Sequence, residues 1–298
     1  MNEEKKFVRN LFLCRFAIFI CMTSVAIWFV FIPWKVNLLS MSESQLGFVF
    51  MIFGLGSLFS IQITNRILLR RYSAESLIRF SLPLFPITFF FWTSSSSYGY
   101  LLFYALPLSL CFGIINSSVL SATLNYEKLT GRRFMPMHQA SFSIGGLSGS
   151  VLGGILMNFI ENPEISILFV SVSSFISIIF LVVKRVVCLE PINEAIEASM
   201  PSRLSLVLGT MAAINLGTVG IILDWSALWL TREFSVAAAL GGSIIFAFNS
   251  GEIISRVSGE KLINRFGEKV VGTYFMLIGC AVLFCTLLLA KVELVVFE

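Results

Sequence analysis

Residues 11–34 read LFLCRFAIFICMTSVAIWFVFIPW, an apolar run that is interrupted by one charged residue, Arg15. A helix needs about 20 mostly apolar residues to cross a hydrocarbon core that is ~30 Å thick. The run is long enough, and no small-residue cleavage site follows it. We therefore expect a permanent membrane span here rather than a signal peptide.

Eight further stretches share the length and apolar character of the first. The nine expected spans are 11–34, 45–64, 77–96, 98–122, 137–159, 165–187, 204–230, 237–258 and 270–290. Of the 298 residues, 57% are hydrophobic and only 13% are charged, whereas about 25% are charged in soluble domains. This composition excludes a cytosolic enzyme, a secreted domain and a nucleic-acid-binding protein. It predicts an all-α, polytopic membrane helical bundle of about nine helices.

Lysine and arginine residues are unevenly distributed between the two sides of these spans. If the N-terminus is cytoplasmic, seventeen of them fall in cytoplasmic segments and three in external ones, namely Lys35, Arg232 and Lys291. Cytoplasmic loops of membrane proteins carry the excess of positive charge. We therefore expect a protein of the cell inner membrane with a cytoplasmic N-terminus and, for nine spans, an external C-terminus.

The chain also contains an internal repeat at a shift of 194 residues, which places Arg71 on Arg265, each in a basic turn between two spans. The repeat predicts a six-helix N-terminal half at 1–187, a cytoplasmic linker at 188–203 and a partial C-terminal half of three helices at 204–298. Repeats of this kind are typical of secondary transporters, which bind their solute between the two halves near the middle of the membrane.

The second copy of the basic turn, residues 259–267, reads GEKLINRFG. It resembles the G-x-x-x-D-R-x-G turn of the major facilitator superfamily, in which glycine permits a tight turn. The first glycine comes one residue early, and asparagine replaces the acid. The residues that the resemblance assigns to such turns are Arg71, Gly259, Asn264, Arg265 and Gly267.

Residues 127–149 around the fifth span and 223–228 in the seventh resemble a bacterial subgroup of this superfamily, the MosC-like proteins, whose solutes are uncharacterised or sugar-like. The resemblance implies a secondary transporter of a small solute. A coupling proton is suggested only by Asp224, and Val219, where the subgroup often has another acid, weakens that suggestion. The superfamily usually has twelve spans, so we expect a chain that is truncated after nine. The alternative is a membrane protein that does not transport, or one that needs a second chain to cover its open C-terminal half.

Ionisable groups inside a bilayer cost several kcal/mol, so they are the first candidates for a solute site. Arg15 could hold an anionic group of the solute or reach the lipid headgroups. Asp224 could carry a proton or contact the solute, or it could pack at the interface. Trp28 and Trp225 could stack on a sugar-like solute or anchor their spans. The substrate-binding candidates are Arg15, Asn116, Asn215, Asp224 and Trp225.

Three further features favour structural interpretations. Glu252 and Arg256 stand at i and i+4 in the eighth span, so they can pair near the cytoplasmic gate. The glycines between 145 and 154 resemble the end of an antiporter motif, although close helix packing is favoured. His138 could titrate, although an interfacial hydrogen bond is favoured.

The sequence carries no catalytic motif and no cluster with metal-ligand spacing. Its six cysteines form no CxxC pair, so neither a zinc site nor a disulfide framework is expected. We therefore expect a protein that is not an enzyme and that uses no cofactor and no metal.

Overall fold

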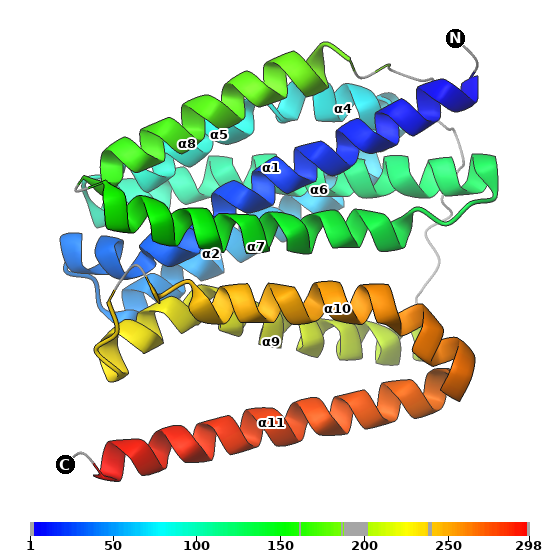
Figure 1. Ribbon diagram of the computed structural model, residues 1–298. Coiled ribbons are helices and arrows are strands. Elements are labelled where there is room, and N and C mark those ends of the chain that lie inside the picture. The colour runs from blue at the N-terminus through cyan, green and yellow to red at the C-terminus, as the bar shows by residue number, and fades with distance from the viewer. Residues whose placement is uncertain (1–2, 161, 186, 188–201, 238–239, 297–298) are drawn as a thin grey trace. The chain divides into compact units, whose positions relative to one another are not determined.

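The computed structural model describes residues 3–160, 162–185, 187, 202–237 and 240–296. The regular structure within these ranges is helical (Figure 1). The elements are α1 (Glu3–Leu38), α2 (Glu43–Ile63), the π-helix η1 (Thr64–Leu68), α3 (Leu69–Arg71), α4 (Ala74–Ser81), α5 (Leu84–Thr93), α6 (Tyr98–Thr130), α7 (Met135–Phe159), α8 (Pro163–Ser177), the π-helix η2 (Ile178–Val183), α9 (Arg203–Glu233), α10 (Ser243–Phe266) and α11 (Glu268–Val296). The chain forms two units, residues 1–250 and 251–298, which are described separately.

Side-chain caps fix the residues at which several helices begin. Ser42 and Gln45 form a capping box at α2, in which the Gln45 backbone N–H donates to Ser42 Oγ at 3.2 Å and the Ser42 N–H donates to Gln45 Oε1 at 2.9 Å. Ser73, Ser97 and Ser202 accept a backbone N–H in the same way at the starts of α4, α6 and α9. Such caps satisfy donors that the first helical turn leaves free.

Among the residues that the structure describes, seven helices are long and apolar enough to cross a membrane, and the pair α4 and α5, bent by 41°, is an eighth candidate. The expected count of nine spans is therefore not confirmed. The difference lies in the stretch at 237–258. Its helix, α10, begins only at Ser243 and carries charged side chains from Glu252 onward, so its apolar part is too short. The predicted linker at 188–203 falls almost wholly outside the described residues, and the division into halves stays a prediction.

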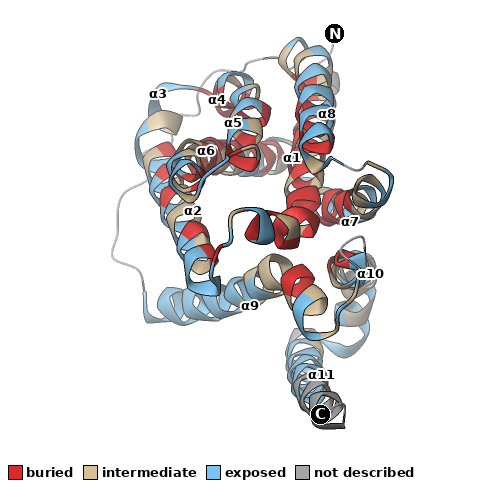
Figure 2. Ribbon diagram, turned by 90° about the vertical axis from the view of Figure 1, so that its left-hand side faces the viewer, coloured by how far each residue is buried: buried red, intermediate tan, exposed pale blue. Residues whose placement is uncertain are grey.

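The core of the first unit surrounds α1. This helix packs against α6, α7, α8 and α9. Of its apolar 18-residue stretch, 78% is buried. Buried residues are concentrated in α1, α6 and α7 (Figure 2). Residues 203–217 of α9, in contrast, are exposed. The exposed surfaces of the other helices are rich in large apolar side chains, as expected for surfaces that face lipid.

A buried polar network joins α1, α4 and α6. The hydroxyl of Tyr126 donates to Glu75 Oε1 and accepts from Asn10 Nδ2 at 3.2 Å. The same asparagine binds both backbone groups of Val187, donating to its oxygen at 2.8 Å and accepting from its N–H at 3.1 Å. The three side chains are at most 4% exposed. The network thus holds the start of α1 to two other helices and to the segment that follows η2.

Candidate functional site

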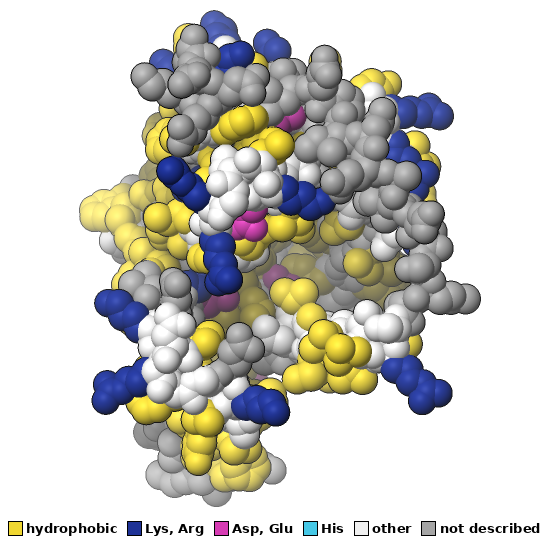
Figure 3. Space-filling view, turned by 90° about the vertical axis from the view of Figure 1, so that its right-hand side faces the viewer, with side chains coloured by type: hydrophobic (Ala, Val, Ile, Leu, Met, Phe, Trp, Pro, Cys, Tyr) yellow, Lys and Arg dark blue, Asp and Glu magenta, His cyan; other side chains and the backbone are white. Residues whose placement is uncertain are grey.

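Basic side chains gather at the end of the first unit where α1 begins. They are Lys6, Arg9, Arg66, Arg70, Arg71, Lys128, Arg132, Arg133, Lys184, Arg185 and Arg203, and they flank the starts of α1, α7 and α9 and the ends of α3, α6 and η2. We call this the basic end. Figure 3 looks onto it and shows Lys and Arg side chains around the face, with few acidic ones. The arrangement agrees with the expected orientation, in which these segments are cytoplasmic.

Glycines of α7 line the face that packs against α1. A Cβ atom placed on Gly145 would lie 2.7 Å from the backbone oxygen of Phe19, and one placed on Gly153 would lie 3.0 Å from Cβ of Val30. These distances are too short for ordinary contacts, so the absence of side chains on this face allows the two backbones to approach closely. The contacts agree with the packing interpretation of this glycine-rich segment.

At the end opposite the basic end, α9 packs against α1 and α2. Val30, Ala227 and Ile245 form a cluster in which each residue is fully buried. Trp225 of α9 meets Phe50 of α2 edge to face, with ring centroids 5.9 Å apart and planes at 75°. We call these five residues the apolar seal.

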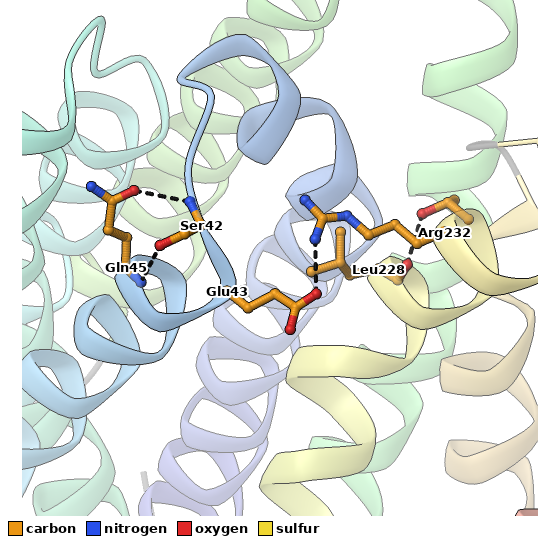
Figure 4. Close-up of polar contacts among 6 residues, drawn as sticks. Ser42, Glu43, Gln45, Leu228 and Arg232 are labelled. Atoms are coloured by element: carbon orange, nitrogen blue, oxygen red, sulfur yellow. Dashed lines mark hydrogen bonds and ion pairs between the residues drawn. The ribbon is translucent and has the colours of Figure 1, made fainter.

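An ion pair lies at the rim of this contact. Arg232 Nη1 donates to Glu43 Oε1 at 2.9 Å (Figure 4). Glu43 begins α2 directly after the capping serine, and Arg232 lies in the last turn of α9. Their side chains are 67% and 38% exposed, and exposed pairs contribute only about 0.2–1 kcal/mol. The apolar seal therefore holds this end together more than the ion pair does.

The two parts of α9 differ in their surroundings. Residues 203–217 are exposed, whereas Ser226, Ala227 and Leu228 are buried. Within the first unit, α9 is therefore buried only toward its C-terminal end, where the apolar seal lies. The helix approaches α1 and α2 at one end of the bundle and not at the basic end.

Arg15, the charged residue of the first span, lies in the part of α1 that faces the start of α7. Its Nη2 donates to the backbone oxygen of Phe134 at 3.3 Å, and its guanidinium carbon lies 5.8 Å from the centre of that ring. The side chain is half-buried. Arg15 is therefore placed at the basic end, between α1 and α7.

The other candidates lie elsewhere in the first unit. Asp224 and Asn116 are half-buried, and neither has a hydrogen bond or ion pair with any residue that the structure describes. Asn215 is exposed on the first part of α9. Trp225 belongs to the apolar seal. Trp28 is packed in the core against Trp92, with ring centroids 4.4 Å apart.

The structure thus brings Asp224 and Trp225 to the sealed end as chain neighbours and places Arg15 at the basic end. Within the described ranges, no hydrogen bond, ion pair or ring contact joins the side chains of these three residues to one another, or any of them to Asn116 or Asn215. That the five candidates line one solute path stays a prediction.

The second unit contains the expected pair of α10. Arg256 Nη2 lies 3.2 Å from Glu252 Oε1, which confirms the i, i+4 interaction. One expectation for the motif is wrong, because Gly259 lies inside α10, which continues without a break to Phe266. Only Gly267 forms the turn, with a φ of +83° that favours glycine.

The remaining motif residues lie next to turns. Asn264 and Arg265 are exposed in the last turn of α10, where the guanidinium of Arg265 lies 5.3 Å from the ring centre of Phe266. In the first unit Arg71 is exposed at the end of α3. Ser73, at the position of the missing glycine, has a φ of −66° and caps α4, so this turn does not require glycine.

Three carboxylate contacts were not expected from the sequence. Glu43 binds Arg232, and Glu75 accepts from Tyr126; these partners are far apart in the chain and give no local signal. Glu127 Oε1 accepts the backbone N–H groups of residues 134 and 135, at 2.7 Å for the latter, and so caps the start of α7. Only Glu127 had a sequence signal, since it begins the family-like stretch at 127–149.

Known proteins share this fold and sequence pattern. The sequence model of the Major Facilitator Superfamily matches residues 12–297. An uncharacterized MFS-type transporter of Yersinia pestis is 22% identical over 85% of this chain and 66% of its own length, and an uncharacterized transporter of Sinorhizobium fredii is 25% identical over 82% and 65%. The chain therefore spans just under two thirds of these relatives.

Two solved structures have the same fold at low identity. Both are of a bacterial homologue of the human lysosomal transporter Spinster, in inward-facing occupied and unoccupied conformations. The occupied form has a TM-score of 0.62 and 15% identity, and it covers 89% of this chain and 63% of that chain. The unoccupied form has a TM-score of 0.60 and 13% identity, with coverage of 88% and 64%. At this identity the likeness shows the fold alone.

Proposed function

The chain belongs to the major facilitator superfamily, and from this premise we propose that it is a secondary active transporter of a small solute. The family consists of transporters rather than enzymes. The observation that carries the proposal is the one-ended packing of α9. This helix meets α1 and α2 at the apolar seal, while residues 203–217 near the basic end are exposed. Packing of α9 at one end of the bundle only is the arrangement that alternating access to a solute uses.

The contacts of the first unit suit such a cycle. The glycine-lined packing of α7 on α1 is close and involves backbone atoms, so these two helices move together. The rim of the seal, in contrast, depends on one exposed ion pair between Glu43 and Arg232. An interaction of this strength can break and re-form during a transport cycle.

The direct test is solute uptake by the purified chain in liposomes, with a panel of labelled sugars, sugar acids and amines. Uptake that is saturable and absent from protein-free liposomes supports the proposal. If no member of the panel enters faster than in protein-free liposomes, with or without an imposed proton gradient, the non-transporting alternative replaces it.

The ion pair at the rim provides a prediction about opening of the seal. Leu223 packs against the buried cluster, so a cysteine at this position reports exposure to the external solution. Glu43→Lys places two positive charges together and should accelerate labelling of that cysteine by a membrane-impermeant maleimide up to about fivefold. The double variant Glu43→Lys/Arg232→Glu should restore slow labelling. Equal rates in all three proteins would contradict the gating role of the pair.

We propose that Asp224 carries the coupling proton and that Asn116, Asn215 and Trp225 contact the solute. Support comes from the half-buried carboxylate of Asp224, for which the described residues offer no partner, since such a group inside a membrane is costly. Asp224→Asn should abolish accumulation driven by a proton gradient and should preserve exchange of labelled for unlabelled solute. Unchanged accumulation by this variant would exclude Asp224 from coupling.

We further propose that the protein lies in the inner membrane with the basic end in the cytoplasm. A green fluorescent protein inserted after Gly131, at the basic end, should fluoresce, and one inserted after Ser40, at the other end, should stay dark. The same fluorescent protein fused after Glu298 shows whether the number of spans is odd or even. With nine spans it should not fluoresce. The reverse pattern of the first two insertions would invert the orientation.

The second chain, which the sequence offers only as an alternative, can be tested on the same helix. Residues 203–217 of α9 are exposed on every face of the helix, so the face with Asn215 can contact the solute while the remaining faces still need cover. We infer that protein rather than lipid covers those remaining faces. Native mass spectrometry of the complex extracted in mild detergent identifies whether the cover is a second polypeptide.

A further inference from the structure

The side chain of Arg15 and the backbone N–H of His138 donate to the same carbonyl oxygen. Arg15 Nη2 donates to the oxygen of Phe134 at 3.3 Å, and the backbone N–H of His138 donates to the same oxygen at 3.1 Å. The guanidinium therefore lies against the first turn of α7, the turn that carries His138. The two residues come from helices that remain packed together along their length.

Each of these side chains holds a buried nitrogen without a partner among the described residues. The atoms are Nε of Arg15 and Nδ1 of His138. His138 is only 2% exposed, whereas the half-buried Arg15 keeps contact with the surface at the basic end. A buried polar atom that lacks a hydrogen bond destabilises a protein. Two such atoms, in residues that share one carbonyl acceptor, indicate a place where another group completes the hydrogen bonding.

The charge of Arg15 is not balanced by a carboxylate of the described chain. The acidic residue of the α6–α7 connection, Glu127, instead binds the backbone N–H groups at the start of α7. Arg132 and Arg133 lie in the same connection and are exposed. The surroundings are therefore positive, and they favour a negatively charged group.

We propose that Arg15 and His138 together bind the oxyanion of a carboxylate or phosphate group on the transported solute, which enters from the basic end. This inference rests on the proposed transport function and names the substrate class. A guanidinium can donate two parallel hydrogen bonds to an oxyanion, and the imidazole donates a third from the ring nitrogen that carries the proton. The headgroup of an anionic lipid has the same chemistry, so the test distinguishes the two sources.

The single histidine of the chain is a direct probe of this site. The purified protein, labelled with ¹⁵N-histidine and placed in phosphatidylcholine nanodiscs, gives the signals of one imidazole. Gluconate, glucose 6-phosphate and inorganic phosphate are added at constant pH, with glucose as the uncharged control. At least one of the anions is expected to shift the imidazole signals in a saturable manner, and glucose is not. A second set of nanodiscs with phosphatidylglycerol tests the lipid as the source.

Two variants and a matched control link the shift to Arg15. Arg15→Gln should weaken the saturable shift at least about tenfold, and Arg15→Lys should weaken it less, because lysine keeps the charge and loses the bidentate geometry. Arg66→Gln removes an exposed arginine at the same end and should leave the shift unchanged. His138→Gln removes the imidazole signal, so anion binding to this variant is measured as the rise in melting temperature when the anion is added. This rise should be lost.

The outcomes separate this inference from the proposed function. A shift with phosphatidylglycerol alone supports an oxyanion site and assigns it to lipid, which overturns the solute as its ligand. No shift with any anion or lipid, or an equal shift in Arg15→Gln, overturns the site even if the liposomes accumulate a neutral solute. Anion binding without uptake of any solute leaves the site in place and contradicts transport.

Discussion

Replacement of Gly149 by alanine is expected to destabilise the protein by about 1–3 kcal/mol, which is the usual cost of inserting a methyl group into a well-packed interior. A Cβ atom on Gly149 would overlap the backbone carbonyl of Thr23 and lie 2.7 Å from Cβ of Ala26. The nearest atoms belong to the backbone of α1, so they cannot move aside as a flexible side chain would. The helices must separate, and the contacts along their length weaken.

The measurement is the apparent melting temperature of the detergent-solubilised protein, followed by size-exclusion chromatography. Gly54→Ala is the matched control, because Gly54 is also helical but a Cβ there would meet nothing within 4 Å. Alanine is favoured over glycine in a helix by about 0.5–1 kcal/mol, so the control should be slightly stabilised. Opposite signs for the two substitutions are expected, and equal signs would show that the close packing of α1 and α7 does not limit stability.

The second large effect is expected at Tyr126. Tyr126→Phe removes the hydroxyl that joins Glu75 to Asn10 and leaves both without this partner in a buried site. Each buried polar group that loses its hydrogen bond costs about 1–3 kcal/mol, and a charged one costs more. The variant should therefore melt well below the parent protein and label more readily at buried cysteines.

A double variant shows whether the network is the cause. Tyr126→Phe/Glu75→Leu removes both the donor and the acceptor, so the combined loss should be smaller than the sum of the two single losses. Tyr98→Phe is the control, since the Tyr98 hydroxyl donates to the backbone oxygen of Gln45 at 3.3 Å in an exposed setting. Strict additivity of the two core substitutions, or an equal loss in the control, would contradict the proposed coupling.

Much of the fold could be predicted from the sequence because the membrane restricts the choices. Long apolar runs located the helices from α1 to α9, and the capping box at Ser42 fixed the start of α2. The helices extend beyond the apolar runs, since α1 begins at Glu3 and α6 ends at Thr130, and the predicted span 77–96 is divided into α4 and α5. The errors arose where a local pattern competed with helix continuity. Gly259 matched a turn motif, yet no neighbouring residue stops α10 there, and the helix continues to Phe266.

The site was predicted less completely, for a different reason. Charge and polarity in an apolar run identify a residue as a candidate, which is how Arg15 and Asp224 were found. The partner of a candidate depends on which helices are neighbours in space. Arg15 meets Phe134, and Glu43 meets Arg232, across long separations in the chain, and one sequence carries no record of such pairs.

The packing of α7 on α1 also dictates an order of events during synthesis. The ribosome completes α1 long before it reaches the glycines that fit against it, from Gly145 to Gly153. At 5–20 residues per second the delay is on the order of ten seconds. Throughout that time the newly inserted first helix has to remain in the bilayer beside the translocon without its main neighbour. Its surface at Phe19, Thr23 and Ala26 is apolar or bonded to its own backbone, which makes that wait compatible with lipid.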